Sequence, residues 1–198
     1  MHADASTSQV HRKVVWGGRI RFVVALLAAA ALTSCSETVR TGQASSYLVM
    51  TSLSGASGVP VASDVISDKG SIAADTGTAS FQLQMRDVLN QPSANNAITL
   101  TQFHVEYVRA DGHNVPGVDV PYPFDGGLTL TITGTGSAPF TLVRIQAKEE
   151  APLKALRFGG GAGAINTVAR VTFYGHDQTG REVTVTGNVE VNFADWAG

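Results

Sequence analysis

The residue with the most distinctive chemistry is Cys35, the single cysteine of a chain of 198 residues. It follows Leu32, Thr33 and Ser34, which close an uncharged apolar run that begins at Phe22. A thiol is a soft nucleophile, and small neighbours let a peptidase reach the backbone. These residue types therefore suit chemistry at sulfur beside a cleavable peptide bond.

The segment before Cys35 has the order of a secretory signal: basic, then apolar, then small. Its basic residues are Arg12, Lys13, Arg19 and Arg21. The apolar run covers the 11 residues 22–32, whereas a helix needs about 20 residues to cross the hydrocarbon core of a bilayer. We therefore expect a signal peptide rather than a permanent transmembrane anchor, with a buried core helix as the alternative.

The stretch Leu32-Thr33-Ser34-Cys35 resembles the lipobox of bacterial lipoproteins. The resemblance implies that Cys35 carries a diacylglycerol on sulfur, that cleavage follows Ser34, and that the new amino terminus is acylated. Two or three long acyl chains hold a protein stably on a membrane. Because Ser36 stands where an aspartate would signal inner-membrane retention, the resemblance also implies the outer membrane of a two-membrane bacterium.

Charge and composition limit the partners of the chain that remains after cleavage. Removing residues 1–34 takes four basic residues and Asp4 from totals of 14 and 16, which leaves 10 basic and 15 acidic residues. An acidic chain without a basic cluster argues against nucleic acid as a partner. The small, polar residues after Cys35 predict a flexible tether over 35–46, followed by one domain over 47–198.

Alternation of apolar and polar residues with a period of two dominates that domain. The clearest alternation, at 183–193, follows a similar one at 170–173 and the turn sequence "HDQTGRE", and so predicts a C-terminal β-hairpin. Further expected strands are 47–53, 59–66, 79–89, 98–110, 128–133 and 140–147, and the leucine spacing of 149–158 predicts a short helix. Together they predict an all-β fold: a single antiparallel β-sandwich, immunoglobulin-like in the broad sense, after an N-terminal signal helix.

Two local features of these strands carry predictions of their own. The apolar positions of 98–110 change face partway, which predicts a β-bulge near Thr101 and Gln102. Gly187 interrupts an otherwise regular strand and predicts either a bulge or a close contact.

Titratable residues suggest alternatives that the spacing does not support. His104 and Glu106 share one face of a strand, but a zinc site needs three or four ligands, and His113 and His176 fall in turns. The aspartates 64, 68, 75, 119 and 125 lack the spacing of a calcium loop. The glycine-rich stretch 159–164 has its probable helix before it and its strand after it, the reverse of a dinucleotide fingerprint, and predicts a surface loop. We expect neither a metal nor a cofactor.

The loop 111–126 contains the candidate ligand surface, which consists of Tyr122, Phe124 and His113. Its prolines restrict the backbone, and exposed aromatic rings on a stiff loop can bind sugar or protein. The alternative is that both rings cap an open end of the core.

The sequence therefore predicts a lipid-anchored cell-envelope protein with a non-enzymatic binding or structural role. Its expected partners are the membrane, through lipid on Cys35, and another envelope protein or a glycan. Two alternatives stay open: an envelope hydrolase or metal-dependent enzyme that uses His104, Glu106 or His113, and a carbohydrate-binding module that uses Tyr122.

Overall fold

A computed structural model of the chain describes residues 45–196. The predicted signal peptide, Cys35 and the predicted tether as far as residue 44 lie outside the described residues. Over 45–196, no helix is both long enough and apolar enough to cross a membrane.

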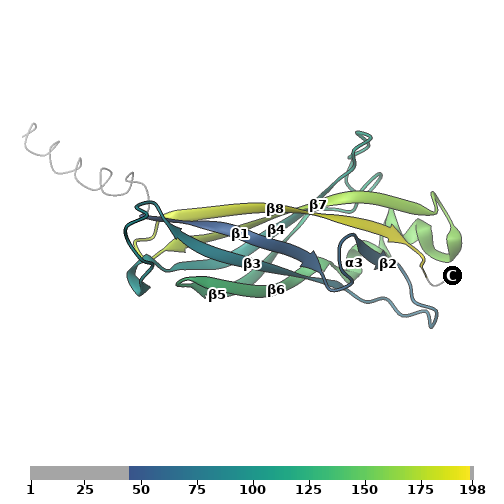
Figure 1. Ribbon diagram of the computed structural model, residues 1–198. Helices are drawn as coiled ribbons and strands as arrows, with labels where there is room; N and C mark the ends of the chain where they lie inside the picture. Colours follow the sequence, from purple (N-terminus) through teal and green to yellow (C-terminus); the bar gives the residue numbers. More distant parts are fainter. Residues whose placement is uncertain (1–44, 197–198) are drawn as a thin grey trace, which may run out of the picture. The chain divides into compact units, whose positions relative to one another are not determined.

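Eight strands form two sheets that pack face to face (Figure 1). The three-stranded sheet has the order β1-β3-β6 and consists of β1 (Ser46–Gly55), β3 (Asp75–Met85) and β6 (Thr135–Val143). The five-stranded sheet has the order β2-β8-β7-β4-β5 and consists of β2 (Val61–Asp64), β8 (Glu182–Ala194), β7 (Ala164–Asp177), β4 (Ile98–Val108) and β5 (Phe124–Ile132). This confirms the predicted all-β sandwich. One pairing departs from the purely antiparallel prediction, because β2 runs parallel to β8.

Four phenylalanine rings join the two sheets at the centre of the sandwich. Phe173 of β7 packs edge-on against Phe81 of β3 and Phe140 of β6, with ring centroids 5.0 and 5.3 Å apart. Phe103 of β4 lies 5.4 Å from Phe140. Each ring occupies an inward position of its strand, where period-two alternation places apolar side chains. Edge-to-face pairs of this kind stabilise a core beyond the area that they bury.

The local predictions for the five-stranded sheet are confirmed. The register of β4 against both β5 and β7 shifts between Leu100 and Gln102, which places the bulge at Thr101. β7 and β8 form the predicted hairpin. Gly187 pairs regularly with Val171, so it marks the close contact rather than a bulge: a Cβ there would lie 2.4 Å from Met50 Sδ.

Several boundaries differ from the prediction. β3 ends at Met85, and the apolar residues Val88 and Leu89 lie in the turn that follows, ahead of the 3₁₀ turn η1 (Ala94–Asn96). β5 begins at Phe124, four residues before the predicted start, because Gly126 and Gly127 carry no side chains and hide the alternation.

The sequence predicted a strand at 140–147 and a helix at 149–158, and the structure divides this segment differently. β6 stops at Val143, and a short helix, α3 (Ile145–Glu149), follows it. The predicted helix at 149–158 is instead the 3₁₀ segment η2 (Leu153–Gly159). Pro152 lacks the N–H that a continuous α-helix would need there. Leu153 and Leu156, whose spacing predicted the helix, are both buried.

A buried ion pair fastens α3 to both sheets. The Lys148 ammonium is buried and lies 2.9 Å from Asp75 Oδ2 at the start of β3. It also donates a 2.7 Å hydrogen bond to the carbonyl of Asp64 at the end of β2, and Ser63 Oγ donates to the Asp75 carboxylate. The buried ammonium therefore has both a counter-ion and a carbonyl acceptor, as buried charges require.

Removing the cation of this cluster should destabilise the fold. In Lys148→Met the carboxylate of Asp75 keeps its charge but loses its counter-ion. Breaking a buried pair costs about 3–5 kcal/mol, and we expect the lower end because the Asp75 side chain is 23% exposed. Urea unfolding of the purified protein measures the change.

The control is Lys154→Met, which removes an exposed lysine of the neighbouring segment and should change the free energy of unfolding by less than about 0.5 kcal/mol. Equal urea midpoints for the two variants would contradict a stabilising role of the Lys148–Asp75 pair.

Candidate functional site

A cleft opens where the edges of the two sheets meet, between β5 and β6. It has a volume of about 520 Å³, within the range of about 300–1,000 Å³ typical of small-molecule sites. β5 contributes its first four residues, 124–127, and β6 contributes 139–141; Thr76, Phe103 and Arg144 complete the lining. The rings of Phe103, Phe124 and Phe140 give it an apolar wall. β5 and β6 are edge strands of different sheets, and Phe124 is the partly exposed ring of this wall, whereas Phe103 and Phe140 are buried.

Gly126 shapes the wall of the cleft. A Cβ at this position would lie 2.2 Å from the Phe103 ring, so only glycine lets that ring approach β5 so closely. The ring of Phe103 then meets Phe124 edge-on at 6.2 Å. The glycine that hid the start of β5 in the sequence thus brings two aromatic rings together.

Arg144 supplies the positive charge of the cleft. Its guanidinium lies over the Phe124 ring at 4.9 Å from the centroid, a cation–π contact. Its Nε is buried and has no hydrogen-bond partner among the described residues. A buried donor without a partner costs free energy unless a water or a ligand satisfies it. The positive charge of the guanidinium and the apolar wall suit a ligand that combines an anionic group with an apolar body.

Tyr107, close to Arg144, serves the core rather than the cleft. Its hydroxyl donates a 2.7 Å hydrogen bond to the carbonyl of Leu142 in β6. Burial raises the pKa of Tyr107, the charge of Asp75 raises it further, and the charge of Arg144 acts against both. The hydroxyl therefore stays protonated and remains a donor.

The three residues of the predicted ligand surface have different local surroundings. Phe124 belongs to β5 rather than to a loop, and it lines the cleft while packing against the core. Tyr122 is half-exposed, with its ring directly over Gly117, where a Cβ would lie 2.3 Å from the ring. His113 lies earlier in the chain, in the loop that follows β4.

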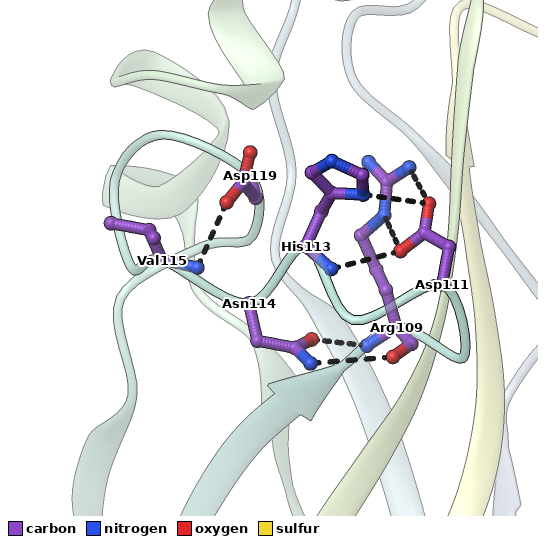
Figure 2. Close-up of polar contacts among 6 residues, drawn as sticks. All are labelled: Arg109, Asp111, His113, Asn114, Val115 and Asp119. Atoms are coloured by element: carbon purple, nitrogen blue, oxygen red, sulfur yellow. Dashed lines mark hydrogen bonds and ion pairs between the residues drawn. The ribbon is translucent and has the colours of Figure 1, made fainter.

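Hydrogen bonds and ion pairs within the loop hold His113 in place (Figure 2). The Arg109 guanidinium donates hydrogen bonds to both oxygens of the Asp111 carboxylate, and His113 Nδ1 lies 3.5 Å from the same carboxylate. Hydrogen bonds from the Arg109 side chain and from the backbone N–H of His113 lower the pKa of Asp111 to about 2. Asn114 bonds the backbone of Arg109 in both directions. These contacts close the loop upon itself.

Polar contacts across neighbouring strands involve two residues of the predicted enzyme alternative, His104 and Glu106. His104 Nδ1 lies 2.8 Å from Asp125 Oδ1, and the Arg170 guanidinium lies 2.9 Å from Glu106 Oε1. Within 45–196, no group of three or more histidine, aspartate or glutamate side chains could hold a metal ion. Ser63 and Lys148 come near each other through Asp75, but both are buried, out of reach of a substrate.

A second hollow lies on the outer face of the five-stranded sheet. It has a volume of about 460 Å³, and Tyr174 projects there from β7. Polar residues surround this ring: Thr101, Gln102, His176, Glu182 and Thr184. Gly175 also lines the hollow. β4 lies so close to it near the bulge that a Cβ at this position would be 2.2 Å from the carbonyl oxygen of Thr99.

Sequence reasoning found Phe124 but missed Arg144 and Tyr174. An arginine directly after a strand looks like a solvated side chain, and the tyrosine stands at a polar position of β7. The change of face within 98–110 was the signal for the second hollow, because bulges often re-aim side chains at functional surfaces.

No known family matches the sequence, and no curated protein matches it. One solved structure with some likeness is the solution structure of a protein described as late embryogenesis abundant (LEA). It shares 8% identity at a TM-score of 0.39 over 95% of this chain and 97% of that one.

Arg144 should determine whether the cleft binds anions. We expect the fluorescent probe 1-anilinonaphthalene-8-sulfonate, which joins aromatic rings to a sulfonate, to bind the folded protein through this cleft. A hydrogen bond to a charged group contributes about 1.5–3 kcal/mol, so Arg144→Met should weaken binding about 10- to 100-fold. Fluorescence titration at constant ionic strength measures the dissociation constant.

The matched control is Arg170→Met, which removes an exposed arginine of β7 and should leave the dissociation constant unchanged. Circular dichroism confirms that both variants fold. If both variants bind the probe as the unsubstituted protein does, the cleft is not its site.

Proposed function

We propose that this chain is a lipid-anchored cell-envelope protein whose β-sandwich binds a small amphiphilic anion in the cleft between β5 and β6. Acyl chains on Cys35 hold it to the membrane, and in a two-membrane bacterium it resides at the outer membrane. The role is binding rather than catalysis. Binding in the cleft pairs the anionic group of the ligand with Arg144 and its apolar part with Phe103, Phe124 and Phe140.

The observation that carries the anchoring proposal is the sequence Leu32-Thr33-Ser34-Cys35 at the end of an apolar run. Two facts agree with it. A lipidated cysteine needs no partner, which fits a chain with one cysteine. β1 begins at Ser46, so 11 residues from Cys35 lead directly into the sandwich.

The observation that supports binding is that aromatic rings and the Arg144 guanidinium line the same cleft. Most buried polar atoms in proteins have a partner, and the Nε of Arg144 has none among residues 45–196. A carboxylate, phosphate or sulfonate in the cleft would pair with the guanidinium, and charge-assisted hydrogen bonds of this kind are stronger than neutral ones.

A second candidate function is glycan binding, at Tyr174 rather than at Tyr122. The hollow at Tyr174 offers one exposed ring and several polar side chains that can exchange hydrogen bonds with hydroxyl groups. The phenol ring of Tyr122 packs over Gly117 instead.

Replacing the cysteine should abolish anchoring. When the full chain is expressed in a two-membrane bacterium with an alkyne fatty acid, the unsubstituted protein should acquire label and lose residues 1–34. Cys35→Ala should carry no label and accumulate at the mass of the precursor. Click-chemistry gels and intact mass spectrometry measure both outcomes.

Two controls make the anchoring test specific. Ser36→Ala should still be labelled and fractionate with the outer membrane, whereas Ser36→Asp should be labelled but retained at the inner membrane. A free thiol at position 35 of the natural product, or an uncleaved leader, would refute the anchoring proposal.

The glycan candidate has its own test, a glycan array probed with the folded protein. If glycan binding occurs at the outer face, Tyr174→Ala should abolish the signal and Tyr122→Ala should preserve it. Loss of signal in Tyr122→Ala alone would locate the glycan at the loop, and an array without signal would remove this candidate.

A further inference from the structure

Two adjacent apolar side chains project into solvent from the turn after β3. Val88 is 86% exposed and Leu89 is 88% exposed. Asp87 fixes the turn, since its carboxylate accepts hydrogen bonds from the backbone N–H of Leu89 at 3.0 Å and from Asn90 Nδ2 at 2.7 Å. These bonds hold the backbone so that both apolar side chains point away from the core.

This turn lies beside the point where the described chain begins. The backbone N–H of Arg86 donates to the carbonyl of Ser45 at 3.0 Å, and Asn96 Nδ2 donates to Ser45 Oγ at 2.9 Å. On β1, Ser46 Oγ donates to the carbonyl of Asn96 at 3.2 Å. Contacts on both sides of Val88 and Leu89 thus fasten the turn to Ser45, at the end of the sandwich where β1 starts (Figure 1).

We propose that Val88 and Leu89 insert into the lipid bilayer and form a second membrane contact beside the acylated Cys35. This inference rests on the proposed lipid anchor. Ser45 is the tenth residue after Cys35, so a fully extended chain between them spans at most about 36 Å, and a coil spans less. The end of the sandwich that carries Ser45 is therefore held close to the bilayer, and its turn is the part that meets the lipid.

The residues around the turn suit a membrane interface. Tyr47 of β1 is about half-exposed, and the Arg86 guanidinium lies over its ring at 6.0 Å. Tyrosine, with an apolar ring and a polar tip, concentrates at the headgroup level of membranes, and arginine binds phosphate groups. The carboxylate of Asp87 is already occupied by the two hydrogen bonds of the turn.

The neighbouring turns at the same end add little net charge. The turn of the β7–β8 hairpin pairs Arg181 with Asp177 at 4.0 Å and also carries the exposed Glu182, so acidic residues exceed basic ones there by one. The β5–β6 turn at Thr133 and Gly134 carries no charge. Attraction to anionic lipid is therefore weak at this end, and burial of apolar side chains is the interaction that favours lipid contact.

A lipid surface fits this position better than a partner protein does. Protein interfaces need a patch of roughly 800 Å² on each partner, whereas this turn offers two side chains at a tip. Two side chains suffice for a contact that acyl chains already hold at the membrane, because anchoring raises the effective concentration of the turn at the bilayer.

Site-specific fluorescence measures the insertion. The full chain is expressed as the lipoprotein, purified in detergent and reconstituted into phosphatidylethanolamine–phosphatidylglycerol vesicles. Because Cys35 is the single cysteine and its thioether cannot react with maleimide, Leu89→Cys provides the sole free thiol for an environment-sensitive dye. We expect blue-shifted emission and loss of most of its intensity when the vesicles carry a doxyl-labelled lipid as quencher.

The matched control is Val118→Cys, since Val118 is also apolar, 67% exposed and located in a turn. It follows the opposite end of β4, whose 11 residues span about 35 Å. Its dye should keep the emission of an aqueous environment and resist the lipid quencher. Val88→Cys is a second test variant and should behave as Leu89→Cys does.

The outcomes separate this inference from the anchoring proposal. Dye uptake by the unsubstituted protein would show a free Cys35 thiol and refute the anchor. If the unsubstituted protein takes no dye and the dyes at positions 89 and 118 are equally unquenched, the anchor stands and the inserted turn is wrong. A blue shift at position 89 without lipid quenching would also overturn insertion and indicate a protein contact instead.

Discussion

The packing of two sheets through four phenylalanine rings is the constraint on which the rest of the structure depends. Phe81 and Phe140 come from the three-stranded sheet, and Phe103 and Phe173 come from the five-stranded sheet. Sheets stacked face to face stand about 10 Å apart, and large rings fill that space without a disulfide. Two of these rings also reach the cleft: Phe103 and Phe140 are buried in the core and form part of its lining at the β5–β6 edge.

The buried Lys148 solves a different problem at the α3 end of the sandwich. β2 and β3 belong to different sheets, so no backbone ladder joins them. One ammonium reaches a carboxylate of β3 and a carbonyl of β2 at once. Apolar residues of similar volume can stabilise a core as well as such a pair does. The pair also holds the start of β3 at Asp75 next to the end of β2 at Asp64. We infer that a polar cluster is used here because it fixes these two positions.

Features that depend on the alternation within one strand could be predicted from the sequence. Features that depend on contacts between strands could not. The β7–β8 hairpin and the bulge at Thr101 follow from apolar positions within single segments, and both are confirmed. The predicted start of β5 was wrong because Gly126 has no side chain to show the alternation. The space that a side chain would take is occupied by the Phe103 ring of β4. Arg144 and Lys148 were missed because their partners, Phe124 and Asp75, are distant in the chain. The cleft likewise draws its lining from four strands, whose pairing no local pattern records.

The two ends of the sandwich differ in the charge that they expose, and this difference bears on orientation. Charged side chains gather at the end opposite Ser45, in the loop after β4 and around α3 and η2: Arg109, Asp111, Asp119, Glu149, Glu150, Lys154 and Arg157. Asp111, whose pKa is lowered to about 2, keeps its charge at any physiological pH, and moving such a group out of water is costly. The Ser45 end carries fewer charged side chains, among them Arg86, Asp87, Asp177, Arg181 and Glu182, and it exposes Val88 and Leu89. If acyl chains hold the protein through Ser45, as we propose, the more highly charged end faces water.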